Sequence, residues 1–202
     1  MIIGKEISKC FDDLVVFDNL SFKIEDGEFV CFSGESGKGK TTLLNIIGLL
    51  EPIDSGQLII NGREYKGNKE KRYYYRNEVG FLFQNFALIE NKTVEQNLRI
   101  IRSKSISNID VENVLQRVGL AEKLHNKVYT LSGGEQQRVA LARLMLKPCN
   151  LILADEPTGS LDKKNAGIVM SLLKTLNDEG KTVLIVSHDE EIKNMVDRRI
   201  EL

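Results

Sequence analysis

The chain has 202 residues, and its 28 lysines and arginines nearly balance 29 aspartates and glutamates, leaving a formal net charge of −1. This length suits one domain that folds without disulfides or a structural metal, and three scattered cysteines indicate a reducing cytoplasm. The balanced charge argues against a general nucleic-acid binder and against disorder, no apolar run approaches the ~20 residues that span a bilayer, and the first residues are unlike a secretion signal.

The first 85 residues predict short strands around one helix. Strands are expected at Ile2–Ser8, Val15–Phe17, Ser21–Ile24 and Glu28–Phe32, with Asp26-Gly27 as a turn, and a helix at Thr41–Leu50. Asn61-Gly62 predicts a hairpin between Gln57–Ile60 and Arg63–Tyr65, and Val79–Phe83 is typical of a buried strand. The basic run Lys66–Arg76 predicts a solvated helix rather than a nucleic-acid site, because it also contains Glu70 and the net charge is slightly negative.

The middle of the chain has helical signals, and the last third alternates strands with a helix. Thr93-Val-Glu-Gln96 is typical of a capping box, and Asp110 begins a helix that ends near Gly119, so residues ~86–145 are expected to be mainly helical. Leu151–Ala154 and Thr182–Val186 are apolar strands on either side of a helix that stops at Gly180. Apolar strands alternating with helices indicate an α/β fold with a parallel sheet covered on both faces.

A glycine-rich stretch between a strand and a helix matches a phosphate-binding loop. Gly34-Glu-Ser-Gly-Lys-Gly-Lys-Thr41 follows the pattern G-x-x-x-x-G-K-[ST]. Glycines let the backbone wrap an anion with its N–H groups pointing inward, and the next helix adds its positive end. We expect Lys40 to reach the β- and γ-phosphates and Thr41 to bind Mg²⁺. The alternative is a plain glycine-rich turn, which the strand–loop–helix context disfavours.

Polar residues follow three further strands. Gln84 comes directly after the predicted strand Val79–Phe83. Asp155 and Glu156 come directly after Leu151–Ala154, and Ser187-His188 comes directly after Thr182–Val186. Each has an unremarkable alternative, such as a helix cap for Asp155, but ligands of open α/β sheets sit beyond the carboxyl ends of the strands. Asp155 is suited to hold Mg²⁺, and Glu156 to orient or deprotonate a water. Gln84 is suited to contact Mg²⁺ and that water, and His188 the γ-phosphate.

The string Leu131-Ser-Gly-Gly-Glu-Gln-Gln-Arg138 is the most specific in the chain. Ser132 and Glu135 form a capping box, which does not by itself require Gly133 and Gly134. Those glycines would permit a ligand to approach the helix N-terminus, which predicts a second anion site.

Over nearly its whole length the sequence resembles the nucleotide-binding subunit of ATP-binding cassette (ABC) transporters. The phosphate loop resembles the family's Walker A motif, Leu151–Glu156 its Walker B motif and Leu131–Gln136 its signature. Gln84 matches the Q-loop, Ser160-Leu161-Asp162 the D-loop and His188 the switch histidine. The implied fold is a RecA-like P-loop ATPase, one domain over residues 1–202. Its parallel-sheet core and antiparallel β subdomain take residues 1–85 and 146–202, and its helical subdomain takes ~86–145.

The resemblance assigns roles residue by residue. It implies catalytic roles for Lys40, Gln84, Glu156 and His188, and a Mg²⁺ site at Thr41, Gln84 and Asp155. ATP would be bound by Gly34, Glu35, Ser36, Gly37, Lys38, Gly39, Lys40, Thr41, Thr42 and Asp162. It further suggests that Phe11 stacks on adenine, where a tyrosine is commoner. Lys38 replaces a usually small residue, but only backbone N–H groups are needed there.

The family also implies a head-to-tail dimer with two ATP molecules between its subunits. Ser132, Gly133 and Gly134 of one copy would then cap the γ-phosphate bound to Lys40 of the other. This arrangement accounts for two phosphate sites in one chain.

Two segments, Phe83–Ile89 and Ala154–Gly159, resemble the macrolide-export, lipoprotein-release and cell-division branch of the family. We expect an ATPase on the inner face of the cell membrane that powers export of a peptide, lipoprotein or drug-like substrate through a separate transmembrane permease, with no nucleic-acid partner. One alternative is an ATPase that drives a membrane partner as a mechanical signal without transport. A soluble relative in DNA repair or translation is disfavoured, because the chain lacks a long coiled-coil insertion and a second cassette.

Overall fold

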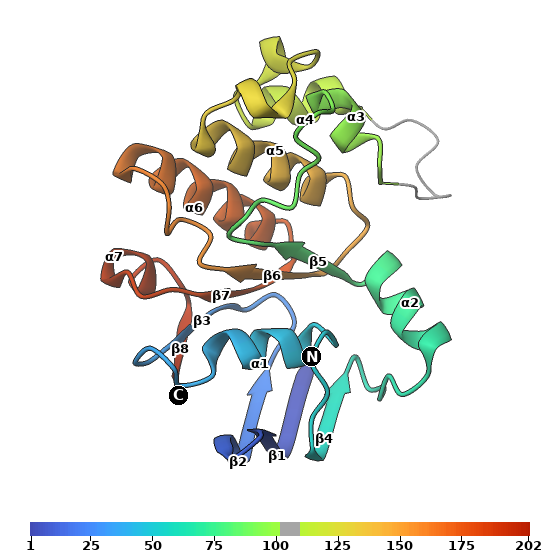
Figure 1. The fold of residues 1–202 in the computed structure, drawn as a ribbon, viewed down its shortest axis with the longest axis vertical. Coiled ribbons are helices and arrows are strands. Elements are labelled where there is room, and N and C mark those ends of the chain that lie inside the picture. The colour runs from blue at the N-terminus through green and yellow to red at the C-terminus, as the bar shows by residue number, and fades with distance from the viewer. Residues whose placement is uncertain (102–109) are drawn as a thin grey trace.

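A computed structural model describes residues 1–101 and 110–202, which form two sheets with helices between and above them (Figure 1). Its strands are β1 (Ile2–Phe11), β2 (Leu14–Ile24), β3 (Phe29–Ser33), β4 (Ser55–Ile60), β5 (Val79–Leu82), β6 (Leu151–Asp155), β7 (Thr182–Val186) and β8 (Arg198–Glu201). Its α-helices are α1 (Lys40–Ile47), α2 (Asn68–Asn77), α3 (Val94–Leu98), α4 (Val111–Arg117), α5 (Gly133–Met145), α6 (Lys163–Asp178) and α7 (Glu190–Lys193), with short 3₁₀ turns at Ala121–Lys123 and Val128–Thr130.

The larger sheet has five parallel strands in the order β5-β6-β7-β3-β8. Its central strands are buried on both faces because successive side chains alternate between two helical layers. Val30 and Phe32 of β3 pack toward α1, whereas Phe29 and Cys31 pack toward α5 and α6. This alternation explains why the strands are apolar throughout, and it confirms the predicted α/β sheet.

The smaller sheet is antiparallel, in the order β2-β1-β4, and α1 lies between it and the parallel sheet (Figure 1). Two strands predicted at 15–17 and 21–24 are one strand, β2, because the ladder shifts register between Ile7↔Leu20 and Lys9↔Phe17 and continues. At this irregularity Asn19 has a φ of 56° and its N–H donates to Ser8 Oγ. The residues between the two predicted strands therefore lie within β2, at a bulge.

Two details of the predicted β structure are wrong. Arg63–Tyr65 is not a strand: Arg63 forms a single bridge back to Ile60, and β4 stays the edge of the smaller sheet. β8 is not among the predicted strands, because its polar sequence lacks the apolar run of a central strand. It lies at the edge of the parallel sheet, beside β3.

The helices between β5 and β6 pack on one another in a separate apolar cluster. Thr93 and Asp110 cap α3 and α4 as predicted, and the cluster includes Leu98, Leu115 and Val139 from α3, α4 and α5. Residues 102–109 of this segment lie outside the described residues. Within the part of the chain that the structure describes, no helix is long and apolar enough to span a bilayer.

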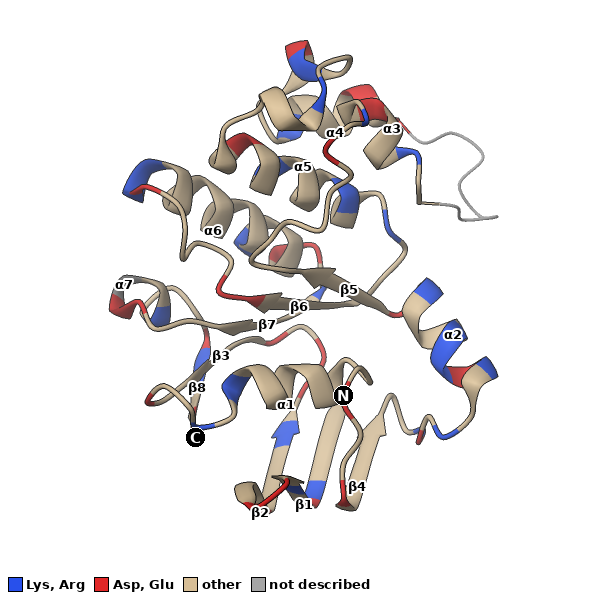
Figure 2. Cartoon of the chain, in the orientation of Figure 1, with Lys and Arg blue, Asp and Glu red and all other residues tan. Residues whose placement is uncertain are grey.

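The predicted basic helix is α2, which carries most of its lysines and arginines on the outside (Figure 2). Its buried anchor is Tyr74, which is fully enclosed and donates its hydroxyl to Ile47 O at 2.9 Å. Tyr75 donates similarly to Leu49 O. These bonds fix α2 against the end of α1, because each satisfies a carbonyl near the helix C-terminus.

We predict that Tyr74→Phe lowers the free energy of unfolding by about 1 kcal/mol, since it leaves the buried Ile47 carbonyl without this donor. Thermal or urea unfolding measures the change. The matched control is Tyr73→Phe, because Tyr73 is 51% exposed. Equal stability of Tyr74→Phe and wild type would contradict the anchoring role.

Candidate functional site

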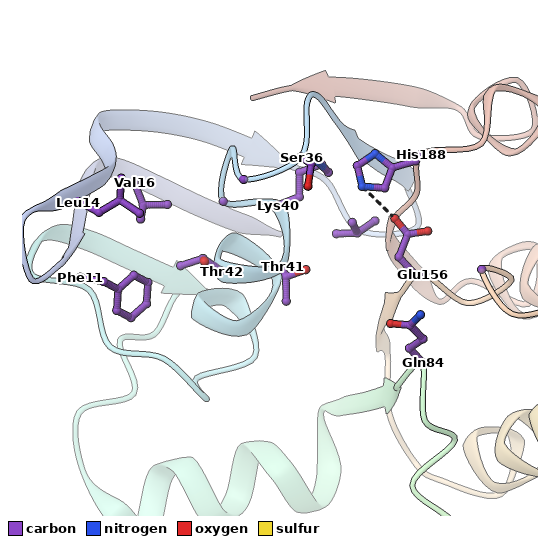
Figure 3. Close-up of a pocket in the computed structure, with 14 residues that line it drawn as sticks. Phe11, Leu14, Val16, Ser36, Lys40, Thr41, Thr42, Gln84, Glu156 and His188 are labelled. Carbon is purple, nitrogen blue, oxygen red and sulfur yellow. Dashed lines mark ion pairs between the residues drawn. The ribbon is translucent and has the colours of Figure 1, made fainter.

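The loops that follow β3, β5, β6 and β7 meet at one edge of the parallel sheet, because all four strands run in the same direction. Together with the end of β1 and the start of β2, they enclose a cavity of about 540 Å³ (Figure 3). Its lining contains most of the residues singled out in the sequence: Phe11, Ser36, Gly37, Gly39, Lys40, Thr41, Thr42, Gln84, Glu156 and His188.

The phosphate-binding loop curls around its own lysine. The Lys40 ammonium donates to Gly34 O at 2.9 Å and to Glu35 O at 2.6 Å, and the residue is only 5% exposed. Lys40 is also the first residue of α1, so its charge sits at the positive end of the helix. The Lys40 ammonium and the partial positive charge of the α1 N-terminus thus lie together, and both favour the binding of an anion there.

The loop's glycines are required by packing as well as by backbone conformation. Gly34, Gly37 and Gly39 all have positive φ. A Cβ on Gly39 would lie 2.4 Å from Val16 Cγ1, and one on Gly34 would lie 2.7 Å from the Leu202 carbonyl oxygen. Gly37 has open space around it, so only its φ of 85° calls for glycine.

The two carboxylates after β6 point to different places. Asp155 Oδ1 accepts a hydrogen bond from Thr41 Oγ1 at 3.1 Å, which joins β6 to the phosphate loop. Glu156 has a φ of 44° and donates its N–H to Val186 O at 3.0 Å, so the β6–β7 ladder continues one residue past the strand. A non-glycine residue at this φ is strained, and its side chain is thereby turned into the cavity.

Glu156 faces His188 across the cavity (Figure 3). His188 Nε2 lies 3.4 Å from Glu156 Oε1. That oxygen is buried and, among the described residues, makes no hydrogen bond. Burial raises the pKa of the Glu156 carboxyl, and the nearby His188 only partly offsets this. Burial likewise raises the pKa of Asp155, against the hydrogen bond from Thr41. Both groups therefore hold protons more readily than exposed carboxyls.

A second, more open groove of about 620 Å³ adjoins the first and shares Gln84 with it. Asp155 and Gly133 line this groove rather than the phosphate-loop cavity. Gln84 follows β5, and Asp155 and Glu156 lie at the end of β6, the neighbouring parallel strand, so Gln84 lines both the space that contains Glu156 and the one that contains Asp155.

The signature segment lies outside the phosphate-loop cavity. Ser132 caps α5, its Oγ accepting from the Glu135 N–H while Glu135 accepts from the Ser132 N–H. Ser132 and Gly133 are exposed, but Gly134 is buried, and a Cβ there would lie 2.5 Å from Asn165. Packing of α5 against α6 therefore already requires Gly134, a reason that the sequence analysis did not see.

Asp162 also lies away from the cavity and caps α6. Its carboxylate accepts from the Asn165 N–H and from the Asn165 side-chain amide, which lowers its pKa. Asn165 in turn accepts from Arg138 at 2.7 Å. The D-loop residue is thus connected to the signature helix through one asparagine.

The cavity has four lining residues that the sequence analysis missed: Leu14, Val16, Gly159 and Val186. Leu14 pairs directly with Phe11 across the β1–β2 ladder. Once Phe11 was singled out, a tight turn at Asp12-Asp13 would have pointed to Leu14. Val186 lines the cavity as the last residue of an apolar strand, where nothing in the sequence distinguishes it from its neighbours.

Comparison with known proteins agrees with this geometry. Residues 17–159 match the ABC transporter family. The macrolide export ATP-binding/permease protein MacB of Bdellovibrio bacteriovorus is 43% identical over 93% of the chain, and the lipoprotein-releasing system ATP-binding protein LolD of Treponema denticola is 40% identical over 96% of it. The dimeric ABC transporter cassette MJ0796 superposes with a TM-score of 0.88 at 36% identity, covering 100% of this chain and 94% of that one.

The lengths of these relatives differ. The chain spans 30% of the MacB protein but 90% of LolD. A second structure of MJ0796, described as a post-hydrolysis state bound to ADP and Pi, superposes with a TM-score of 0.86 at 34% identity and covers 100% of this chain and 94% of that one. With a family match over most of its length and relatives that it covers almost completely, the chain belongs to the ATP-binding proteins of the ABC transporter family.

Proposed function

We propose that the chain binds and hydrolyses ATP and thereby powers transport through a membrane partner. The observation that carries this proposal is the meeting of Lys40, Gln84, Glu156 and His188 in one cavity at the carboxyl edge of the sheet. The cavity joins a cationic phosphate loop to a half-buried carboxylate, which are the two parts that hydrolysis of a phosphoanhydride needs.

ATP would lie along the cavity from Phe11 to the phosphate loop. The base would stack on the Phe11 ring, which is 42% exposed and has Leu14 beside it. The backbone N–H groups of residues 34–42 would surround the phosphates, with the Lys40 ammonium moving from its loop carbonyls to the β- and γ-phosphates.

The residues around Thr41 suit Mg²⁺. The Thr41 hydroxyl, the Asp155 carboxylate and the Gln84 amide all offer oxygen, the donor that this hard cation takes. Within the described ranges no group of three His, Cys, Asp or Glu side chains gathers to hold a metal, so phosphate and water would complete the coordination. Bound there, Mg²⁺ would neutralise charge on the β- and γ-phosphates.

Glu156 is the proposed general base. Its carboxylate would accept the proton of the water that attacks the γ-phosphate, and Gln84 would orient that water. His188, 3.4 Å from Glu156 Oε1, would hydrogen-bond the γ-phosphate and hold the glutamate in place. As the water oxygen bonds to the γ-phosphorus, the bond from that phosphorus to the β–γ bridging oxygen would break and ADP would leave, and Lys40 would stabilise the negative charge that develops on its β-phosphate.

The exposed signature turn leads us to propose a head-to-tail dimer of two chains. Ser132 and Gly133 are exposed and do not line their own phosphate-loop cavity, and they lie at the N-terminus of the 13-residue helix α5. In the proposed dimer this turn, with Gly134 and Asp162, completes the nucleotide site of the partner. That the related cassette MJ0796 is a dimer supports this arrangement.

A separate transmembrane permease is the proposed partner, with the chain on the cytoplasmic face of the membrane and residues ~86–145 as its helical subdomain. The relatives are named for macrolide export and lipoprotein release. These names favour export of a peptide, lipoprotein or drug-like substrate over a mechanical signal without transport, and no nucleic-acid partner is proposed.

Lys40→Ala is expected to weaken ATP binding by at least about tenfold, because charge-assisted bonds to phosphate are lost. Calorimetry or a fluorescent ATP analogue measures the affinity. Lys38→Ala is the matched control in the same loop, since its side chain is exposed and its backbone N–H is kept. Undiminished binding by Lys40→Ala would contradict the proposed phosphate site.

Glu156→Gln is expected to retain ATP binding, lose hydrolysis and accumulate as an ATP-bound dimer, because the nucleotide that joins the two copies is no longer cleaved. Gel filtration with light scattering, with and without ATP, measures the dimer, and phosphate release measures the activity. A variant that stays monomeric at saturating ATP would contradict the head-to-tail dimer.

Because the pKa of Glu156 is raised in the folded state, the stability of Glu156→Gln relative to wild type should depend on pH in a predictable direction. A carboxyl whose pKa is higher in the folded state destabilises the fold once the pH exceeds its unfolded value. Glu156→Gln should therefore melt higher than wild type at pH 8, by on the order of 2 °C, and the difference should vanish near pH 4. Glu135→Gln is the opposite control, because hydrogen bonds from Ser132 lower the pKa of Glu135. It should melt lower than wild type at pH 8. The same sign for both variants would contradict the assigned causes.

A further inference from the structure

A lysine with little exposure lies beneath the aromatic ring at the end of the cavity. Lys9 is 5% exposed, and its ammonium lies 4.7 Å from the centroid of the Phe11 ring. Both residues belong to β1, where side chains two positions apart share a face. Phe11 lines the cavity, whereas Lys9 is not one of the described residues that do so. The ammonium therefore lies over the ring but outside the lining of the cavity.

Two carboxylates hold this ammonium. Lys9 Nζ lies 2.6 Å from Glu51 Oε1 and 3.4 Å from Asp54 Oδ1. The hydrogen bond to Glu51 is the main reason that the pKa of Lys9 is raised, so the group stays charged at neutral pH. An ammonium with so little access to water needs such partners, since removing a charge from water is costly unless it is paired.

Asp54 also fixes the strand itself. Its Oδ2 accepts from the Cys10 N–H at 2.7 Å, and its own N–H donates to Ser8 O at 3.0 Å. The segment that leaves α1 thus binds β1 on both sides of Lys9. The position of the Phe11 ring is set by this segment as well as by its own strand.

The same helix therefore connects both ends of the cavity. α1 begins at Lys40 and Thr41 in the phosphate loop. At its other end, the Glu51 N–H donates to Asn45 O, which ties the segment that carries Glu51 back onto the helix. Eight helical residues give α1 a length of about 12 Å, and it is packed in the core on both sides. A rigid element thus separates the phosphate loop from the lysine beneath Phe11.

From these contacts we propose that Lys9 is a positioning residue for the base of the nucleotide: it holds the Phe11 ring from one face and leaves the opposite face free for stacking. The proposal rests on the proposed ATP site. A cation over one ring face attracts the π-electrons of the ring. This attraction restrains the Phe11 side chain, which is 42% exposed and therefore has few other contacts to hold it. A ring already held in place loses less conformational entropy when a base stacks on it.

If Lys9 acts on the base alone, its replacement should weaken the binding of ATP but not the binding of inorganic triphosphate, which has the phosphates without the base. We expect Lys9→Met, which keeps an unbranched stem without the charge, to bind ATP about 2- to 5-fold more weakly. Its affinity for inorganic triphosphate should not change, because the phosphate loop is untouched. Lys9→Arg should bind ATP nearly as wild type does, since a guanidinium also stacks on an aromatic face. Lys5→Met is the matched control, an exposed lysine on the same strand.

A double-mutant cycle with Phe11→Ala tests whether Lys9 acts through the ring. If it does, adding Lys9→Met to Phe11→Ala produces no further loss of ATP affinity. All affinities are measured by titration calorimetry on the full chain. Additive losses, an equal loss of triphosphate affinity, or an unchanged ATP affinity in Lys9→Met would each overturn the positioning role. Failure of the wild-type chain to bind ATP would instead overturn the proposed function.

Discussion

The register of the parallel sheet is the constraint on which the candidate site depends. Asp155 pairs with Val186, and the ladder extends to the Glu156 N–H, so the residues after β6 and β7 leave the sheet side by side. That alignment sets Glu156 opposite His188 and brings Asp155 to Thr41. A shift of one residue in either strand would turn these side chains to opposite faces of the sheet. The candidate site therefore relies on backbone hydrogen bonds formed by two strands that, apart from Asp155 and Thr182, are apolar.

The signature helix is coupled to the same loop from the other side. The Gln137 amide, 1% exposed, donates to Pro157 O at 2.7 Å, directly after Glu156. The next residue, Arg138, donates to Asn165, whose N–H and side-chain amide donate to Asp162, the N-cap of α6. A movement of α5 would therefore shift the backbone directly after Glu156, the proposed base. In the proposed dimer, these bonds join the helix that carries the signature turn to the loop of the proposed base, Glu156.

Several residues singled out at the candidate site also serve the packing of the fold. Gly39 fits because β2 packs against the phosphate loop, and Gly134 fits because α6 packs against α5. Glu156 instead carries a cost to the fold, since it has a positive φ and a buried oxygen without a hydrogen bond among the described residues. Such strain is maintained because the β6–β7 ladder fixes the backbone on which it sits.

The sequence by itself determined the α/β class, the phosphate loop, the caps of α3, α4 and α5, and the strand ends that carry Gln84, Glu156 and His188. These are local patterns, in which spacing and side-chain chemistry are enough. Only the tertiary structure decided that β2 is one bulged strand, that polar β8 extends the sheet, and that Lys9 lies under Phe11. Those features depend on partners far along the chain, such as Ser8 for Asn19, β3 for β8 and Glu51 for Lys9. Pairing over such separations leaves no periodic signal in the residues that take part.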